Sequence, residues 1–337
     1  MKRAILSVLI ACLLTTLPLG CGRKRKEDNP GSEPRYLLEL KWPAGTYDVD
    51  ADVTLDQKID ADQMDANIVF TMNMDGEMQA NPADEANHRK LAVMITSMKG
   101  KFAGMPMVGD LSFDTTRPAP KQAPQPGMSE RPAAMMHRMM SDVCTKPFTI
   151  TVDADWNVIS RGGMENLSPM LQENPAFDRL GEQTWLDVAQ LLPDHPVGKG
   201  AVWHNMIRRD VPPGGMVEID AECELTDIRD TSHGKVAVIA YTGYIDDASM
   251  QTPDANIDSM DMEIRGELHF TIDGGYPLSD HSSFTADIDA SSQGRDMEIE
   301  LKGEATTVMT RQASASGPER PTEAEDEMPA AAESDDE

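Results

Sequence analysis

The sequence predicts a mainly β protein of the α+β class. We expect a curved antiparallel sheet of about ten to twelve strands, built from two similar halves, with helices of the first half covering its apolar face. Three observations support this fold. Apolar and polar residues alternate along the body of the chain, two stretches of the body recur, and the helical patterns are confined to one region.

Alternation with a period of two is typical of strands that bury one face. It is clearest in residues 217–225, 260–272 and 297–305. One solvent-exposed face and one buried face favour antiparallel pairing over a parallel sheet that is buried on both sides. Residues 236–241 are apolar at successive positions, which predicts a central strand.

The two recurring stretches predict an internal duplication. Residues 45–55 align with residues 215–225 at an offset of 170, so that apolar positions match apolar ones and acidic positions match acidic ones. Each stretch follows a tryptophan, Trp42 or Trp203, in a predicted strand. Residues 148–153 align with residues 268–273 at an offset of 120, each before a predicted hairpin turn. The first half therefore holds about fifty extra residues between its two matched segments.

Residues 1–20 are predicted to be a signal peptide. A basic start precedes an apolar run from Ala4 to Leu19, which is shorter than the roughly 20 residues of a membrane-spanning helix. The run ends in Leu-Pro-Leu-Gly-Cys at residues 17–21 and resembles the lipobox of bacterial lipoproteins. The resemblance implies acylation of Cys21, with palmitate among the acyl groups, and anchoring to a lipid bilayer. Gly22 after this cysteine implies the outer membrane; an ordinary cleaved signal peptide and an uncleaved anchor are the alternatives.

The segments that flank the body are predicted to be flexible. Residues 21–35 form a basic tether that contains Pro, Gly and Ser. Residues 312–337 hold nine acidic residues and one arginine, which predicts a disordered acidic tail. The whole chain has 30 basic and 58 acidic side chains and a net charge of −28. Phosphate repels such a surplus of carboxylates, so we exclude binding to nucleic acid.

The body divides into a first β-rich half at residues 36–197 and a second at residues 198–311. The extra material of the first half consists of a Pro-rich loop at residues 117–132 and a short helix at residues 133–143, and two further helices are expected at residues 167–171 and 174–192. The helix expected at residues 174–192 presents four large apolar residues toward the sheet. Those residues are candidates for lining an apolar ligand: Phe177, Leu180, Leu186 and Leu192.

Three segments of the body resemble a group of uncharacterised exported bacterial proteins, many of which are lipoproteins. They are residues 42–47, 147–153 and 192–203. The resemblance implies a shared β-rich structure and carries no activity with it. The general plan is also similar to lipoprotein carriers, whose half-barrel sheets hold acyl chains against helices, although that likeness is one of architecture alone.

Two cysteines remain in the exported body, Cys144 and Cys223. An oxidising compartment would allow them to form a disulfide, but Cys223 aligns with Val53 in the repeat and equally suits a buried free thiol. Met135, Met136, His137, Met139 and Met140 are interpreted as pliable core rather than as a copper site. We expect no metal ion and no other cofactor.

The sequence contains no motif of a hydrolase, a phosphate-binding loop or a dinucleotide-binding site, and we expect no catalytic residues. The function that we expect is a non-enzymatic binding or structural role in the bacterial cell envelope, with the protein anchored through Cys21. The alternative is a carrier or sensor that holds a lipid or another apolar molecule between the sheet and the helices. The protein partners stay open.

Overall fold

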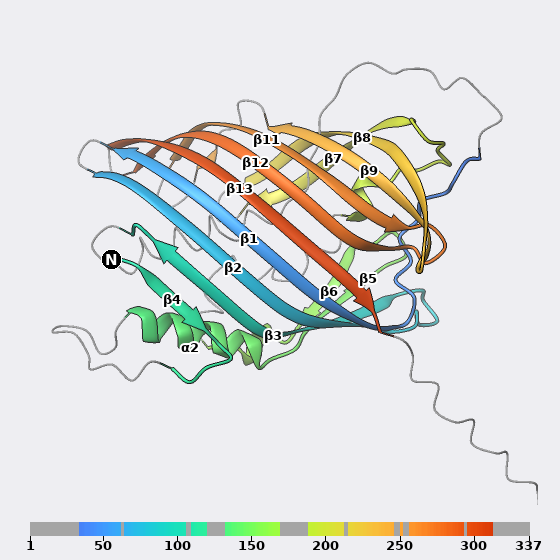
Figure 1. The fold of residues 1–337 in the computed structure, drawn as a ribbon, viewed down its shortest axis with the longest axis horizontal. Coiled ribbons are helices and arrows are strands. Elements are labelled where there is room, and N and C mark those ends of the chain that lie inside the picture. Colours follow the sequence, from blue (N-terminus) through green and yellow to red (C-terminus); the bar gives the residue numbers. More distant parts are fainter. Residues whose placement is uncertain are drawn as a thin grey trace, which may run out of the picture.

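The computed structural model describes residues 34–61, 64–105, 109–119, 132–168, 188–211, 215–245, 250–251, 256–292 and 295–312. Its strands form one antiparallel sheet (Figure 1). They are β1 (Gly45–Ala61), β2 (Met64–Ala80), β3 (Arg89–Ala103), β4 (Leu111–Asp114), β5 (Phe148–Val152), β6 (Val158–Gly162), β7 (Val202–Val211), β8 (Gly215–Thr231), β9 (Gly234–Ile245), β10 (Met250–Gln251), β11 (Asn256–Thr271), β12 (Tyr276–Ser292) and β13 (Arg295–Arg311).

Eleven strands follow one another in the sheet, in the order β6-β5-β3-β2-β1-β13-β12-β11-β9-β8-β7. The short strands β4 and β10 pair with β3 and β11 outside this path. The path has two free edges, β6 and β7, and the sheet is therefore open. The predicted class, a mainly β protein with one large antiparallel sheet, is confirmed. The first and last long strands, β1 and β13, lie side by side in the middle of the sheet.

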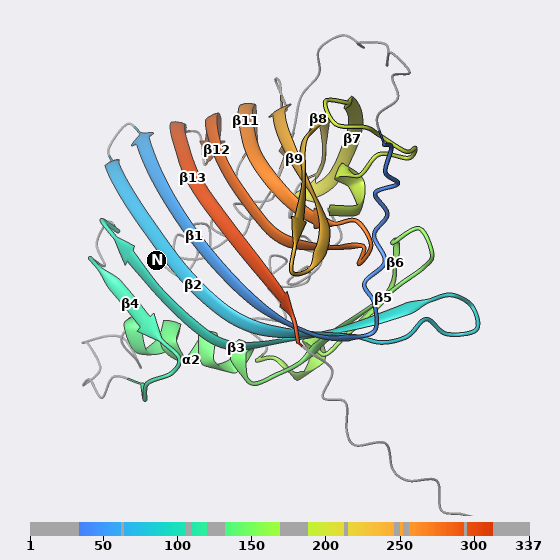
Figure 2. The same ribbon diagram turned by 45° about the vertical axis from the view of Figure 1, so that its right-hand side comes forward.

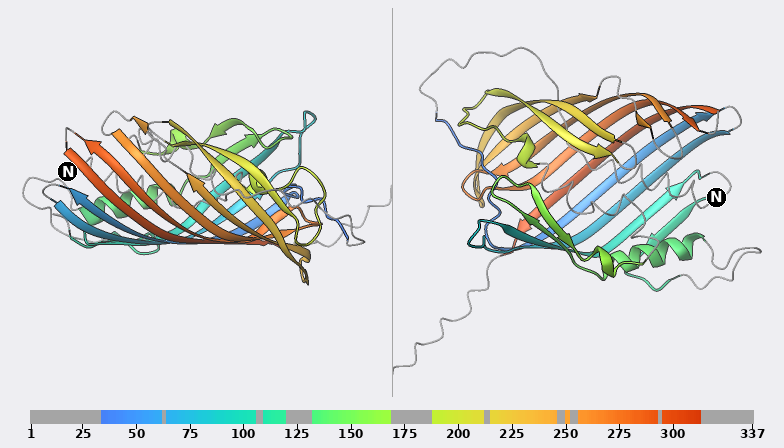
Figure 3. Two further views of the ribbon diagram at one scale, coloured as in Figure 1. Left: turned by 90° about the horizontal axis from the view of Figure 1, so that it is seen from above. Right: turned by 180° about the vertical axis from the view of Figure 1, so that it is seen from behind.

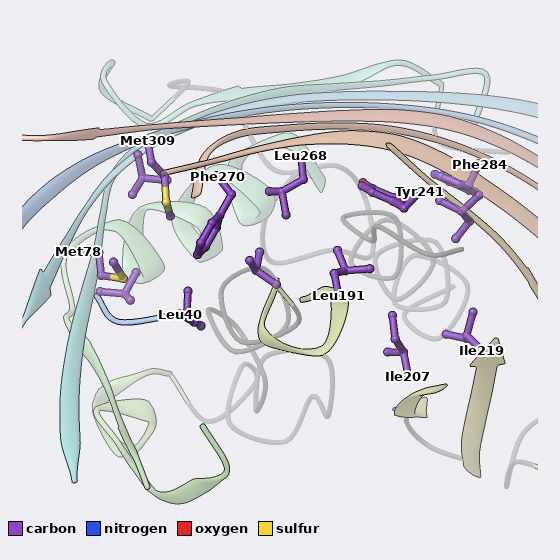
Figure 4. Packing of buried hydrophobic residues seen from close by; sticks show 14 of the residues in the cluster. Leu40, Met78, Leu191, Ile207, Ile219, Tyr241, Leu268, Phe270, Phe284 and Met309 are labelled. Atoms are coloured by element: carbon purple, nitrogen blue, oxygen red, sulfur yellow. The ribbon is translucent and has the colours of Figure 1, made fainter. Parts of the chain in front are cut away.

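The sheet curves into a trough (Figure 2). Its concave face is apolar and its convex face is polar. Strand β1 illustrates the division: every second side chain from Tyr47 to Leu55 is buried, while Asp48, Asp50 and Asp52 point to solvent. Figure 4 shows buried residues of the concave face that come from strands far apart in the sequence. Strand β9 differs at its start, where residues 236–239 are buried on both faces, as the sequence predicts.

The two segments of the first match lie on strands of equal length, β1 in the middle of the sheet and β8 next to the edge strand β7. Strands β1 and β8 each contain 17 residues and begin at the aligned glycines, Gly45 and Gly215. The second match falls on strands with different surroundings: β5 lies three neighbours from β1, whereas β11 lies two neighbours from β8. The first half thus has one more strand between its two matched segments than the second half. This strand, β4 and α2 contain extra residues of the first half, which is why the offset falls from 170 to 120.

The described helical residues come from the first half, as predicted. Helix α2 (Pro132–Cys144) matches the helix expected at residues 133–143 and packs against β3 and β4 at one side of the trough (Figure 3). Of the helix expected at residues 174–192, residues 188–192 are described; residues 188–191 are helical, and Leu192 follows them in a bend. The helix expected at residues 167–171 is not found at Leu167 and Ser168, which follow a 3-10 turn, η1 (Met164–Asn166).

Residues 34–42 form a strap that ties together distant parts of the sheet at one end of the trough. Tyr36 pairs with Val197, just before β7. The backbone N–H of Lys41 donates to the carbonyl of Gly275 in the β11–β12 turn, at 2.7 Å. On the other side, the indole of Trp156 in the β5–β6 turn donates to the carbonyl of Leu40, at 3.2 Å. The strap therefore connects the β5–β6 turn on one side of the open sheet to the β11–β12 turn and the segment before β7 on the other side.

Trp42, which the sequence places in a strand, lies at the end of this strap and is wholly buried. Its backbone φ is +42°, a strained value for a bulky residue. The indole ring stacks on Tyr276 and meets Tyr47 edge-on, with centroid separations of 6.2 and 5.2 Å. Its indole nitrogen has no hydrogen-bond partner among the described residues. Aromatic packing therefore outweighs the cost of the strained backbone at this turn.

Candidate functional site

One row of side chains crosses the middle of the concave face and holds its most unusual residue, Asp280. The register of seven adjacent strands, β2-β1-β13-β12-β11-β9-β8, places these side chains directly opposite one another. We call them the Asp280 row: Met74, Ala51, Thr307, Asp280, Leu268, Ile239 and Leu225. Asp280 is the sole carboxylate of this row.

Asp280 shares its surroundings with two hydroxyl side chains of the concave face. The phenol of Tyr241, on β9, donates a hydrogen bond to Oδ1 of Asp280 at 2.7 Å. Ser282, two residues further along β12, points to the same face and is buried. The loss of hydration inside the trough raises the pKa of the Asp280 carboxyl from 3.8 to about 7, although the Tyr241 hydrogen bond acts in the opposite direction. Burial also raises the pKa of Tyr241 well above its ordinary value.

The Asp280 row is buried at one end and partly exposed at the other. Leu268, Ile239 and Leu225 have no exposed surface. Met74, Thr307 and Asp280 are each only half-buried, and so is Leu278 beside Asp280 on β12. Between them lies Ala51, whose side chain is small. The row is therefore less covered around Asp280 than at Leu225, and an apolar molecule there could contact both methylene groups and a polar anchor.

Aromatic rings lie flat on the concave face over glycines of neighbouring strands. Tyr241 lies over Gly266 and Phe284 over Gly303, and each pair is directly opposite in the register. In Figure 4 the rings of Tyr241 and Phe284 lie along the inner surface, with Tyr241 between Leu268 and Phe284 in this view. A side chain at either glycine would occupy the space of the ring. The glycines therefore keep the lining smooth and hold Tyr241 in reach of Asp280.

Gln57 is a second polar group on the concave face, on β1 and closer to the β1–β2 turn. It is buried, and its Oε1 atom has no hydrogen-bond partner among the described residues. Its register neighbours are Ile68 and Leu301. An unpaired buried acceptor among aliphatic side chains is costly, which makes Gln57 a second point at which a bound molecule could donate a hydrogen bond.

Sequence reasoning missed Asp280 and Gln57 because it assigned polar residues to the wet face of each strand. The signal was nevertheless present: Asp280 and Ser282 occupy the positions that alternate in phase with Phe284, Ala286 and Ile288. Gln57 likewise follows Val53 and Leu55 in phase. Polar residues in the apolar phase of a strand are the pattern that indicates such a site.

Most of the residues predicted to line an apolar ligand lie outside the described part of the chain: Phe177, Leu180 and Leu186. Cys21, the predicted acylation site, lies outside it as well. Leu192 is described, and it is buried against the concave face next to the helical turn at residues 188–191.

The turn before Leu192 is held by two side chains of the edge strand β7. The indole of Trp203 donates to the carbonyl of Leu191 at 2.8 Å. The amide of Asn205 donates to the carbonyls of Gln190 and Leu192, at 2.7 and 3.0 Å. Strand β7 therefore positions the end of the predicted helix over the concave face.

Both cysteines of the body are free thiols in the structure. Cys223 faces inward on β8 between Trp203 and Tyr241, its register partners, and occupies the apolar position that its alignment with Val53 indicates. Burial raises its pKa to about 12. Cys144 ends α2, where its thiol lies 3.6 Å from the hydroxyl of Thr115. Cys144 lies on α2, which packs against β3 and β4, whereas Cys223 lies on β8, which is separated from β3 along the sheet by the six strands β2, β1, β13, β12, β11 and β9.

The methionine-rich helix α2 packs as core. Met136, Met139 and Met140 are buried against the sheet. The ring of His137 is engaged in hydrogen bonds to the backbone. Its Nε2 atom donates to the carbonyl oxygens of Asp114 and Arg117, at 3.0 and 2.8 Å. Ser141 lies 3.3 Å from Nδ1. Among the described residues, no group of three or more His, Cys, Asp or Glu side chains has the arrangement of a metal site.

No helix in the described ranges is long and apolar enough to cross a membrane. No family model matches the chain, and no curated protein matches it. Solved structures do match, 43 chains in all. One is lipovitellin, described in terms of its lipid–protein interactions, at a TM-score of 0.39 and 9% identity over 82% of this chain. The match covers 27% of lipovitellin, so this chain spans about a quarter of that protein.

Two bacterial structures also match. An outer membrane channel from Pseudomonas putida F1 has a TM-score of 0.26 and 6% identity, over 84% of this chain and all of the channel. A DUF1329 family protein from Desulfovibrio piger has a TM-score of 0.17 and 8% identity, over 81% of this chain and 88% of that protein. The functions of these proteins do not transfer to this chain at such low similarity.

Proposed function

We propose that this protein is an exported lipoprotein that is anchored to the cell envelope, at the outer membrane, through acylated Cys21. Its role is non-enzymatic: the concave face of the sheet binds a lipid or another apolar molecule. The protein acts as a carrier or sensor of that molecule.

The observation that supports this proposal is the concave face itself. It presents apolar side chains from eleven successive strands, and it is partly exposed at Met74, Thr307, Asp280 and Leu278. A protein whose only task is structural has no need of a partly exposed polar group within such a face. Ligand sites are typically concave, mostly apolar and equipped with a few polar groups that fix orientation.

Native mass spectrometry of the full chain, purified from bacterial envelopes in mild detergent, tests the binding role. We expect a reproducible mass increment beyond the covalent acyl groups, and organic extraction should release it as one class of apolar molecule. A bare acylated mass, unchanged after incubation with an envelope lipid extract, would contradict the carrier role.

Replacement of the predicted acylation site tests the anchor. We expect the unmodified chain to incorporate labelled palmitate and to sediment with membranes, and Cys21→Ser to do neither. Cys12→Ser is the matched control, because Cys12 lies within the predicted signal peptide and should not be acylated. Equal labelling of the Cys21→Ser and unmodified chains would rule out the anchor and leave the binding role untouched.

A further inference from the structure

We infer that the concave face selects amphiphiles with a cationic amine head, and that Asp280 is the group that binds this head. The inference rests on the proposed function, because the apolar part of the amphiphile would lie along the concave face. Four observations support it: the position of Asp280, its partners, its exposure and the charge of the whole chain.

The first observation is the absence of a counter-ion among the described residues around Asp280. Its register neighbours are Thr307 on β13 and Leu268 on β11, neither of which is charged. Among the residues that the structure describes, the titratable groups near it on the concave face are Tyr241 on β9 and, behind the phenol, Cys223 on β8. No described cation affects its pKa. A carboxylate in this position favours a ligand that brings a positive charge.

The second observation is geometric. The described hydrogen bond of the Asp280 side chain, from Tyr241, engages Oδ1. Asp280 is a half-buried residue at the partly exposed end of the row, although its carboxyl group is largely desolvated. Tyr241 is in turn fixed over Gly266 and cannot easily turn away. The carboxylate is therefore held in one orientation and can accept a charge-assisted hydrogen bond from an ammonium group.

The third observation concerns selectivity between lipid classes. The net charge of the chain is −28, and the convex face carries rows of carboxylates such as Asp48, Asp50 and Asp52. This field attracts cationic amphiphiles and repels fatty acids and other anionic lipids before contact. At the concave face, Asp280 adds a local repulsion against a carboxylate head. The net charge of the chain and the local charge of Asp280 therefore both favour cationic amphiphiles.

Three probes of equal chain length, dodecylamine, dodecanol and dodecanoate, test the inference. Their affinities for the full chain are measured by isothermal titration calorimetry at pH 8, below the micellar concentration of each probe. We expect dodecylamine to bind at least about tenfold more tightly than dodecanol, and dodecanoate to bind most weakly. Below pH 7 dodecylamine must displace a proton from Asp280, because the pKa of this carboxyl is about 7, and its affinity should fall.

The variant Asp280→Asn should lose the preference for the amine and its pH dependence, and should keep its affinity for dodecanol, which also shows that the variant is folded. Asp287→Asn is the matched control, because Asp287 is exposed on the convex side of the same strand. Equal affinities of the three probes, or an unchanged preference in Asp280→Asn, would overturn the inference and leave the binding role standing. Failure of all three probes to bind would count against both proposals.

Discussion

The burial of Asp280 lowers the stability of the folded chain when its carboxyl is ionised. This effect can be measured as a dependence of the free energy of unfolding on pH. The pKa of this carboxyl is about 7 in the folded chain against an ordinary value of 3.8. The folded chain thus retains a proton between these pH values that the unfolded chain has lost. Stability contributed by this proton is fully present below about pH 4 and is lost as the pH rises to about 7.

We therefore expect Asp280→Asn to be more stable than the unmodified chain at pH 8, by roughly 2–4 kcal/mol, and to differ little from it at pH 4. Urea unfolding of both chains at the two pH values measures the difference. Carboxyls with a lowered pKa, such as Asp142 and Asp227, titrate in both chains and cancel. A constant difference between the two pH values would show that Asp280 is not desolvated.

Gly266 is a residue whose lack of a side chain positions Tyr241. A Cβ atom at this site would overlap the Tyr241 ring, so that Gly266→Ala must displace the ring and weaken its hydrogen bond to Asp280. We expect a loss of roughly 1–3 kcal/mol in the free energy of unfolding, measured in urea. Gly198→Ala is the control, because the nearest atom to its added Cβ lies 3.7 Å away. Equal unfolding midpoints for the two variants would contradict the packing described.

At the scale of elements, α2 is attached to the sheet by apolar packing and by the hydrogen bonds of His137. These bonds engage the carbonyl of Asp114, the last residue of β4, and that of Arg117, three residues further on. We expect His137→Ala to lower the free energy of unfolding by roughly 1–3 kcal/mol, because it removes the imidazole hydrogen bonds to the two carbonyls and leaves a gap in the helix packing. The carbonyl of Asp114 keeps a second partner, the backbone N–H of Arg117 at 3.1 Å. The exposed His195 offers a control, His195→Ala, with little expected effect. A helix that serves to bind copper would instead show unchanged stability and loss of Cu(I) binding.

The elements differ in how far the sequence could predict them. Strands β1, β8, β11 and β13 follow from period-two alternation, and α2 follows from its position between Pro132 and the next strand. The strap at residues 34–42 could not be predicted in this way, since its bonds to Gly275 and Trp156 join segments far apart in the sequence. Trp42 was wrongly placed in a strand because its backbone conformation depends on packing against Tyr47 and Tyr276.

The proposed binding site was hidden from the sequence for a related reason. Alternation indicates which residues share a face, but not which strands lie next to each other. The contact between β1 and β13, which brings Ala51 opposite Thr307, joins residues 256 positions apart. The Asp280 row exists only once the order of the strands is known, and so its polar anchor could not be distinguished from the many solvated carboxylates.

At the scale of the whole molecule, β13 completes the middle of the sheet. It pairs with β1 on one side and β12 on the other, so that it joins the arm β6-β5-β3-β2-β1 to the arm β12-β11-β9-β8-β7. Its last contacts are made by Gln312, whose backbone N–H donates to Thr46 and whose amide donates to Asp48. Residues beyond this point are predicted from their composition to be disordered.

Two truncations of the chain separate the contribution of β13 to stability from that of the residues after Gln312. Removal of residues 313–337 should leave the melting temperature nearly unchanged, because every described contact of β13 is retained. Removal of residues 295–337 also deletes β13 and leaves β1 and β12 with unpaired edges in the apolar centre of the trough, a loss that exceeds the usual stability of a domain. We expect that chain to be insoluble or to lack a cooperative thermal transition in circular dichroism. A cooperative transition in the longer truncation would show that the two arms fold independently, and the trough could not then act as one binding surface.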